Sequence, residues 1–492
     1  MNKIDMYDNI LKNLYLDYIN FSTSNSNWIN QDLVFCDEKN IYDNFCAKYD
    51  INKQSNIKTT NLAIIAGIIK GRDKIINNIK EANKKCNIIN YKTYYIFDYD
   101  KISNPDNLSG AAYISEHNLR DIILVAVKKD EINSNKILDV YDELNYLVIN
   151  CEDSSDNTLS EAFKKIEKAK KPVLIVVNPK AFKKKSNKKD ISNIIKTRVN
   201  ANYKKWLNEY DNIINRKENT IIDVINNLSK ENETTIDLEN TNFKLDNSYT
   251  NTMIKSSEKI LNIIKKNTKF FNIVKENNDR LSLNIGIGLS ISKSLVNIVI
   301  NDIDNVCDLI NLSIEENISI NVLVHNTKNI KYIENSLTFY PCDIYEIIGS
   351  FSTYLKYKKT SIMYLSDKES SLVANTNIKY VKYGAYMIKK EESNLDLIIL
   401  SSGVNVSVAL KVDNILRNEN INARIVSMPS INLFLKQPKY EKELLNKKKK
   451  TFVLDNNSNM YNYRFATNEN CVLNASLEEN KIVELIKNEI IV

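Results

Sequence analysis

Glycine, histidine and proline are scarce in this sequence. Its 492 residues include 8 glycines, 2 histidines and 6 prolines. Loops that hold a phosphate are usually built from glycine, because a residue without a side chain lets backbone N–H groups come close to the ligand. Few such loops are possible here. A site built from several histidines is excluded as well, since His117 and His325 are the only two.

Long apolar runs and paired cysteines are also missing. No apolar run reaches the roughly 18 residues of a transmembrane helix, and the N-terminus, MNKIDMYDNI, contains no apolar signal core. The 7 cysteines form no CxxC pair. That pattern argues against a zinc site and for reduced thiols. We therefore expect a cytoplasmic protein with no membrane partner.

The charge of the chain is mild, and part of it is local. The net charge is +7, and lysines cluster in two runs, 180–189 and 447–450. Such runs can contact nucleic acid or phosphate, but a solvated loop is the more common interpretation. No aromatic residues are interleaved with these lysines as a single-strand platform would need. A nucleic-acid partner is therefore the least favoured hypothesis.

The first part of the chain, residues 1–190, has an α/β pattern, and residues 191–250 are rich in Asn and Lys. Short apolar runs separated by helical segments indicate a parallel sheet covered on both faces. The polar segment that follows is predicted to be a linker. The predicted strands are Tyr94–Phe97, Ile122–Val127 and Val173–Val177, and the predicted helices are Leu62–Ile69 and Ile75–Cys86.

Two further α/β blocks follow, which we place at 251–372 and 373–492. Strand, helix and strand with short connections form a βαβ unit, which crosses over with a right hand. The second block has predicted strands at Ile318–Val324 and Thr360–Leu365. The third has strands at Leu395–Leu400, Ala423–Ser427 and Thr451–Leu454, with a helix at Val406–Asn418.

The third block resembles the C-terminal domain of the transketolase family. The family pattern is a strand, T-G-S-E-V, a helix and R-V-V-S-M-P-S. Here Ser402–Val406 (SGVNV) stands at the first motif, and Arg424–Ser430 (RIVSMPS) matches the second almost letter for letter. Tyr383–Tyr386 (YGAY) is similar to the family's G-G-Y entry. The resemblance is specific over about 110 residues, a length typical of one domain.

The resemblance extends backward more weakly. Tyr340–Asp343 (YPCD) is similar to R-P-C/A-D, and Lys171–Ile175 (KPVLI) to K-P-T-L-I. The family implies three stacked α/β domains with mainly parallel sheets. The first binds the diphosphate of thiamine diphosphate, the second binds its pyrimidine ring from the other subunit, and the third helps build the dimer. The implied assembly is a homodimer, or a heterodimer with an intact paralogue.

The family holds Mg²⁺ between the cofactor phosphates and an Asp…Asn pair, next to a G-D-G tripeptide. Tyr99, Asp100 and Lys101 occupy the tripeptide here, and Asp130 falls at the position of the Asn. Asp100 and Asp130 are therefore the candidate metal ligands, and Asp100 and Lys101 the candidate cofactor contacts. Lys101 could reach a phosphate, or pair with Asp100 and replace the metal. Alternatively, both aspartates only cap surface turns.

The catalytic positions implied by the family have changed chemistry. Asn284 falls where the family has the glutamate that activates the cofactor, and an amide cannot share an acidic proton. His325 follows an apolar strand where the family has T-H-D, and is the one candidate histidine retained. Asp367 stands where the family's L-S-R arginine would bind the sugar phosphate. His117 is interpreted as structural.

These losses fall on one site, while the sheet strands and the SMPS motif remain. The resemblance therefore predicts a transketolase-family protein with eroded catalytic motifs, acting as a pseudoenzyme or as a regulatory or structural subunit. The alternative is an active, divergent transketolase of the pentose phosphate pathway. Such an enzyme would use thiamine diphosphate and Mg²⁺ to move a two-carbon ketol unit between sugar phosphates.

Overall fold

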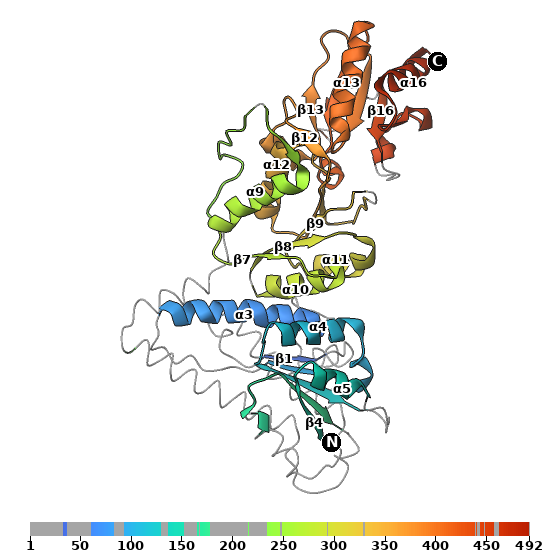
Figure 1. The fold of residues 1–492 in the computed structure, drawn as a ribbon. Helices are drawn as coiled ribbons and strands as arrows, with labels where there is room; N and C mark the ends of the chain where they lie inside the picture. Colours follow the sequence, from blue (N-terminus) through green and yellow to red (C-terminus); the bar gives the residue numbers. More distant parts are fainter. Residues whose placement is uncertain are drawn as a thin grey trace. The chain divides into compact units, whose positions relative to one another are not determined.

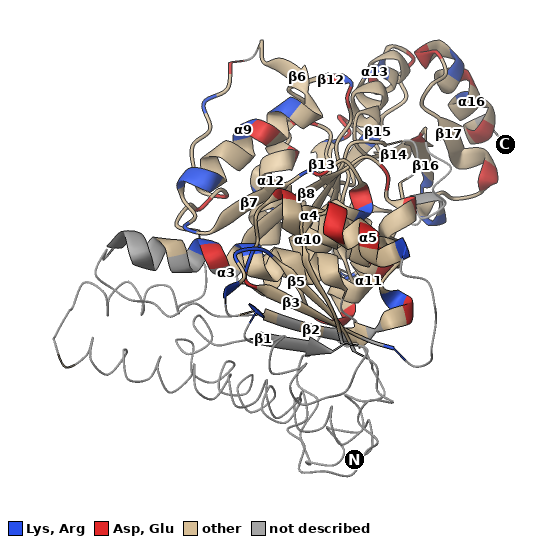
Figure 2. Ribbon diagram, turned by 60° about the horizontal axis from the view of Figure 1, so that its bottom comes forward, with Lys and Arg blue, Asp and Glu red and all other residues tan. Residues whose placement is uncertain are grey.

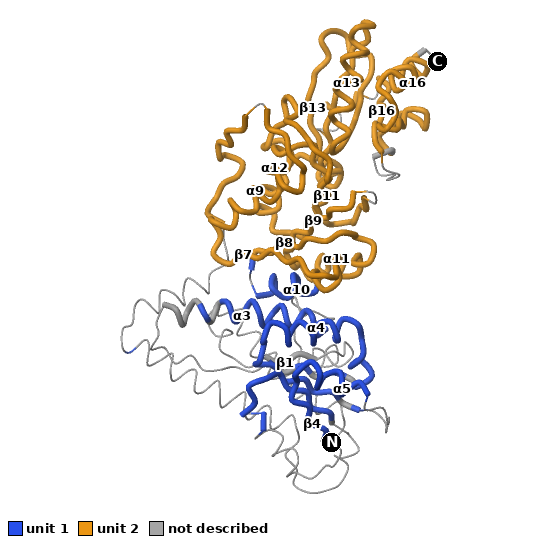
Figure 3. The backbone as a smooth tube through the Cα atoms, in the orientation of Figure 1, with its two compact units in different colours: residues 1–232, 284–294 blue, residues 233–283, 295–492 orange. Residues whose placement is uncertain are grey.

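The computed structural model contains three five-stranded, mainly parallel sheets among the residues that it describes (Figure 1). The described residues are 33–36, 61–82, 93–128, 136–151, 165–177, 215 and 234–491, with short gaps at 167, 247, 293, 328–329, 438, 440–442, 447 and 457–461. Two compact units account for the chain (Figure 3): unit 1 comprises 1–232 and 284–294, and unit 2 comprises 233–283 and 295–492.

Unit 1 is built on the first sheet, in which all strands run parallel in the order β1-β2-β3-β5-β4. The strands predicted at Ile122–Val127 and Val173–Val177 are confirmed with the same bounds. The two predicted helical segments are one helix, α3 (Leu62–Ala82), because the polar stretch between them continues the helix. The other elements are β1 (Leu33–Cys36), β2 (Thr93–Asp98), β4 (Leu147–Cys151), η2 (Tyr99–Lys101), α4 (Pro105–Glu116) and α5 (Lys136–Glu143).

The second sheet lies in unit 2 and is also parallel, with the order β10-β11-β9-β8-β7. Its strands are β7 (Phe271–Val274), β8 (Leu295–Ile300), β9 (Asn321–Val324), β10 (Leu337–Phe339) and β11 (Ser361–Tyr364). The helices are α9 (Met253–Lys266), α11 (Cys307–Glu315) and α12 (Ile344–Tyr357), together with the start of α10 (Asp279–Ile291), whose residues from 284 onward belong to unit 1. A small antiparallel pair joins β6 (Thr250–Thr252) to β12 (Glu369–Ser371). Residues 234–249, the end of the segment predicted as a linker, pack against this core through buried Leu238.

The third sheet has the order β13-β15-β14-β16-β17, and its edge strand β13 runs antiparallel to β15. Its strands are β13 (Tyr386–Lys389), β14 (Leu397–Ser401), β15 (Ala423–Ser427), β16 (Lys450–Asp455) and β17 (Val472–Asn474). The helices are α13 (Asn405–Asn418), α14 (Ile431–Phe434) and α16 (Glu479–Ile491). The strand predicted at Ala423–Ser427 and the helix predicted at Val406–Asn418 are confirmed, the helix beginning one residue earlier.

The side chains of β14 point alternately to the two faces of the third sheet, and they are buried on both. Leu397 and Ile399 pack with α13 and α16, and Ile398 and Leu400 pack with residues that include Met428. This alternation is the period of two expected of a strand. Charged residues are drawn mainly on helices and loops, while the strands are largely uncharged (Figure 2). None of the helices in the described part of the chain has the length and apolar character that a membrane crossing requires.

A buried carboxyl group joins the second and third sheets of unit 2. Glu346 on α12 is fully buried and accepts hydrogen bonds from Tyr386 Oη (2.8 Å) and Ser427 Oγ (2.7 Å), which lie on β13 and β15. The backbone N–H of Cys342 donates to its other oxygen at 2.7 Å. Burial, and next the nearby Asp343, raise the pKa of Glu346 to about 7. Burial thus favours the protonated form of this carboxyl group more than water does.

Asp343 is the N-cap of α12, and its carboxylate has hydrogen-bond partners of its own. Its carboxylate accepts hydrogen bonds from the N–H of Glu346 at 3.0 Å, the N–H of Val373 at 3.0 Å and the hydroxyl of Thr376 at 2.7 Å. Burial raises the pKa of Asp343, and these hydrogen bonds oppose that rise. The negative charge of Asp343 in turn disfavours ionisation of Glu346.

We expect Glu346→Gln to remove a pH dependence of stability. The folded-state pKa lies above the ordinary value of 4.5, so the folded state keeps a proton that the unfolded state releases. The contribution of Glu346 to stability is therefore complete below about pH 4.5 and is lost as the pH rises through about 7, by at most about 3 kcal/mol. Glutamine, being uncharged, has no such loss.

The measurement is urea unfolding of the wild type and Glu346→Gln at about pH 5 and about pH 7.5, with exposed Glu334→Gln as control. The wild type should lose stability relative to Glu346→Gln between the two pH values. A constant difference between them would contradict the assignment.

Candidate functional site

Three of the residues singled out in the sequence lie at the carboxyl end of β2. Tyr99, Asp100 and Lys101 form the short helix η2 directly after this strand. The side chain of Tyr99 is buried, with 5% exposure, and Lys128 Nζ lies 5.0 Å from the centre of its ring. Asp100 is exposed. The carboxyl ends of parallel strands are where open α/β sheets bind ligands, and here a tyrosine ring and a lysine stem fill that place.

Asn284 lies on α10 in unit 1 and is fully buried. Its amide oxygen accepts a hydrogen bond from Asn61 Nδ2 at 3.0 Å, and its amide nitrogen donates to Asp106 Oδ1 at 3.2 Å. Asn61 also caps α3, because its own oxygen accepts from the N–H of Ile64 at 3.0 Å. The amide of Asn284 therefore connects the starts of α3 and α4.

Asn107 extends this network to η2. Its side chain accepts from the N–H of Leu62 at 2.8 Å and donates to the carbonyl oxygen of Lys101 at 2.9 Å. The structure thus brings two sequence-predicted residues, Lys101 and Asn284, to one polar cluster through the adjacent Asp106 and Asn107. Sequence reasoning missed Asn61, Asp106 and Asn107. The available signal was the N-P-D-N run at 104–107, which is a helix start.

Two glycines allow this cluster to form. A Cβ at Gly67 on α3 would lie 2.3 Å from the carbonyl oxygen of Ile285, and one at Gly288 on α10 would lie 2.0 Å from that of Ile64. Any larger residue would push the two helices apart. Ser292 Oγ adds a hydrogen bond to the carbonyl oxygen of Ile68 at 3.0 Å. The close crossing is what lets the side chains of Asn284 and Asn61 meet.

His325 lies in unit 2, directly after β9, and is partly exposed. Its backbone N–H donates to the carbonyl oxygen of Ile300 at 3.0 Å. Burial and then the charge of Lys275 lower the pKa of this histidine, against the smaller opposing effects of Glu258 and Asp279. The imidazole is therefore biased toward its neutral form. Whether it has a catalytic role stays a prediction.

The remaining candidates are dispersed. His117 ends α4, where its ring stacks on Tyr113 with 3.9 Å between the ring centres, in keeping with a structural role. Asp367 is exposed after β11. Asp130 and the lysine run 180–189 lie outside the described residues. Where the chain is described, no three His, Cys, Asp or Glu side chains stand together as metal ligands would.

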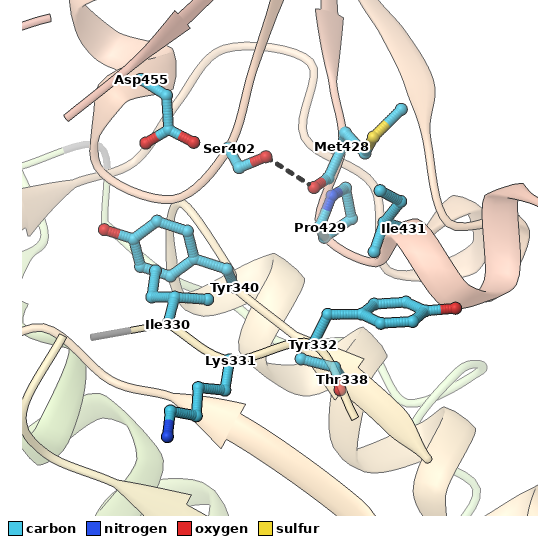
Figure 4. Close-up of a pocket in the computed structure, with 10 residues that line it drawn as sticks. All are labelled: Ile330, Lys331, Tyr332, Thr338, Tyr340, Ser402, Met428, Pro429, Ile431 and Asp455. Carbon is cyan, nitrogen blue, oxygen red and sulfur yellow. Dashed lines mark hydrogen bonds between the residues drawn. The ribbon is translucent and has the colours of Figure 1, made fainter. Parts of the chain in front are cut away.

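A cavity in unit 2 lies near the carboxyl ends of the strands of the third sheet (Figure 4). Its walls come from the loops after β14 and β15, from the end of β16, and from β10 with the residues on either side of it. The lining residues are Ile330, Lys331, Tyr332, Thr338, Tyr340, Ser402, Met428, Pro429, Ile431 and Asp455. Sequence reasoning did not identify this cavity.

Comparison with known proteins assigns the last part of the chain. Residues 384–476 match the transketolase-like TK C-terminal domain. The chain is 34% identical over 118 residues to the transketolase of Mycoplasma genitalium, and 35% identical over 112 residues to the chloroplastic transketolase of Spinacia oleracea. These segments cover 23% and 22% of this chain but only 18% and 15% of those relatives.

Solved transketolases share the fold over nearly the whole chain. The enzyme from Leishmania mexicana superposes with a TM-score of 0.71 at 13% identity, covering 95% of this chain and 92% of that one. The enzyme from Campylobacter jejuni gives 0.72 at 14% identity, covering 99% and 100%. The chain is thus an α/β protein with the mainly parallel sheets of that fold, as predicted. Residues 384–476 in addition match the C-terminal domain of the transketolase family.

We expect Asn284→Asp to destabilise the protein, and more so at neutral than at acidic pH. The substitution places a second carboxylate against Asp106, and like charges in contact raise the pKa of one of them. The expected loss is about 1–3 kcal/mol near pH 7.5 and smaller near pH 5, where one carboxyl group can be protonated.

Asn278→Asp is the matched control, because the oxygen of Asn278 accepts from the N–H of Arg280 at the exposed start of the same helix at 2.8 Å. Aspartate serves equally well there. Urea unfolding at the two pH values makes the comparison. Equal effects of the two substitutions would rule out the contact between Asn284 and Asp106.

Proposed function

We propose that this chain is a non-catalytic transketolase-family subunit with a structural or regulatory role. The observation that carries the proposal is the state of Asn284. A buried amide stands at the position that the resemblance assigns to the activating glutamate, and Asn61 and Asp106 already engage both of its polar atoms. An amide cannot share an acidic proton with a cofactor. Removing one group that acts in the transition state commonly costs about 10²- to 10⁴-fold in rate.

The residues at the end of β2 do not fit thiamine diphosphate and its Mg²⁺. A diphosphate needs close backbone approach, whereas Tyr99 and Lys101 stand at the two glycine positions, and the Tyr99 ring is buried beneath Lys128. Mg²⁺ is held through oxygen ligands, and Asp100 is the one described carboxylate at the tripeptide. Asp367, in place of an arginine, would repel a sugar phosphate. We derive no catalytic step through the cofactor.

The proposed location is the cytoplasm, and the proposed assembly is a dimer, either with itself or with an intact paralogue. A family site that is built between two chains allows an intact partner to supply groups that this chain lacks. The role of this chain would then be to complete the fold of the assembly. The second and third sheets have extensive buried apolar cores, which suit that role.

The decisive experiment is titration calorimetry of the purified chain with thiamine diphosphate and Mg²⁺, together with a coupled assay of ketol transfer between pentose phosphates. A catalytically competent transketolase serves as positive control. We expect no measurable cofactor binding below about 1 mM and no turnover above background, because several members of one catalytic unit are replaced together. Micromolar affinity with turnover near 1 per second would instead establish the active, divergent transketolase.

A further inference from the structure

Polar contacts connect the second sheet of unit 2 and its helices with the third sheet. The N–H of Tyr340, directly after β10, donates to the carbonyl oxygen of Pro429 at 2.8 Å. Asn432 Nδ2 on α14 donates to the carbonyl oxygen of Ser336, just before β10, at 2.9 Å. Glu346 on α12 accepts from β13 and β15, as described above. We call these contacts the joint, and among them only those of Glu346 involve a carboxyl group.

The carboxyl group of Glu346 has only uncharged hydrogen-bond donors within the described part of the chain. They are Tyr386 Oη, Ser427 Oγ and the N–H of Cys342. Glu346 is fully buried, and an ionised carboxylate without a positive partner is costly in such a place. Burial and the nearby Asp343 accordingly raise the pKa of Glu346 to about 7. The closed joint therefore fits the protonated acid better than the anion.

The other titratable groups next to Glu346 do not supply a positive charge. Asp343 lies at the start of the same helix and is negative when ionised. Burial raises the pKa of the Tyr386 hydroxyl and that of the Cys342 thiol above their ordinary values, so both groups are neutral near pH 7. Ionisation of Glu346 therefore adds a negative charge to a buried site whose described neighbours carry no positive one.

The cations on the surrounding elements are exposed or have other partners. The charged residues of α9, which packs against α12, are exposed, and so are Lys356 near the far end of α12 and Glu369 on β12. Within the described residues, no cation is therefore positioned to neutralise Glu346. On η5 (Ile378–Tyr383), Lys379 is exposed. The remaining pairs are Lys389 of β13 with Asp413, Arg424 of β15 with Glu391, and Lys382 of η5 with Glu239.

Opening at the joint would leave the cores of the third sheet intact. Its two own cores contain residues of β14, β15 and β16, and neither includes a residue of α12. The core around the joint instead combines Ile344 and Ile347 of α12 with Tyr386 of β13 and Leu433 of α14. Water that enters between α12 and β13 would therefore reach this core and not the other two.

We propose that the joint is a pH-sensitive switch, in which loss of the Glu346 proton drives a local separation of α12 from β13 and β15. Separation lets water reach the carboxylate, while the third sheet keeps its own cores. The open state releases the proton near the ordinary pKa of 4.5 and the closed state near 7, so the open fraction rises with pH between these values and is constant above them. The switch uses no residue of the cluster around Asn284, so it does not depend on the proposed function.

Hydrogen exchange of the full chain, followed by mass spectrometry, tests the switch. The reporters are the backbone amides of Tyr340, Cys342 and Gly403, because the hydrogen bond of each involves a residue of the joint. After correction for the intrinsic rate of exchange, their opening constant should rise about tenfold or more from about pH 5.5 to about pH 7.5. At about pH 7.5 they should also exchange at least about tenfold faster than the amides of β14, with a smaller dependence on added urea.

Glu346→Gln should keep the joint closed at both pH values. The amide is neutral, its oxygen can accept from the N–H of Cys342, and its nitrogen can donate to Ser427 Oγ, since a hydroxyl accepts as well as donates. The opening constant should therefore change less than about twofold between the two pH values. Glu334→Gln removes an exposed carboxyl group and is the matched control, which should respond to pH as the wild type does.

Any of three results would overturn the proposal. Equal protection of the joint amides and the amides of β14 would mean that α12 and the third sheet separate only when unit 2 unfolds. An opening constant that is the same at the two pH values would remove Glu346 as the trigger. A pH response that persists in Glu346→Gln would assign the trigger to another group. If circular dichroism shows that Glu346→Gln is not folded, the first two comparisons, made on the wild type, still decide the question.

Discussion

The structure depends on a few positions where two segments pack so closely that only glycine fits between them. Of the 8 glycines in the sequence, 7 stand where an added Cβ would come within 3.0 Å of another atom. Gly67 and Gly288 let α3 and α10 cross in contact, and Gly384 and Gly403 adopt positive φ at the entry to the third sheet and after β14. Nearly all glycines of this chain therefore stand where packing or a turn leaves no room for a side chain. At Tyr99 and Lys101, where the resemblance implies glycine beside a ligand, larger residues stand instead.

The crossing of α3 and α10 has a consequence for chemistry. It buries Asn284 between Asn61 and Asp106, which form hydrogen bonds with its amide, while the side chain of Asn107 forms hydrogen bonds with the backbone. Buried polar groups without partners are costly, and a complete network is stable in itself. A site that must receive a cofactor needs the opposite arrangement, with acceptors and donors left for the ligand. The cluster in unit 1 therefore suits a structural role.

The parts of this fold that could be predicted are those with a simple local cause. Ile122–Val127 and Val173–Val177 are continuous apolar runs, and a run of that length buried on both faces is a strand wherever the sheet forms. The hydrogen bonds of Asn284 could not be predicted in this way, since its partners Asn61 and Asp106 lie 223 and 178 positions away. Glu346 was missed for a related reason. Nothing in the sequence distinguishes a buried glutamate on an amphipathic helix from an exposed one until its partners on β13 and β15 are known.

In the third sheet, the residues that the fold requires can be distinguished from those that mark the family. Fold alone tolerates 13% identity to a solved transketolase, because it needs only apolar strands at the right spacing. The sequence match to the family covers residues 384–476. This range spans β13 to β17 and includes Ser402, Met428 and Asp455. Many different apolar sequences could satisfy the packing of these strands. The loops at their carboxyl ends instead carry Gly403 with a left-handed backbone, a carboxylate fixed by Asn405, and a proline carbonyl that positions Tyr340. In unit 1 the side chains of Asn61, Asp106 and Asn284 are joined by hydrogen bonds. At the edge of the third sheet, Ser402 and Asp455 are likewise held by hydrogen bonds to neighbouring groups, and the family match includes the loops that place them.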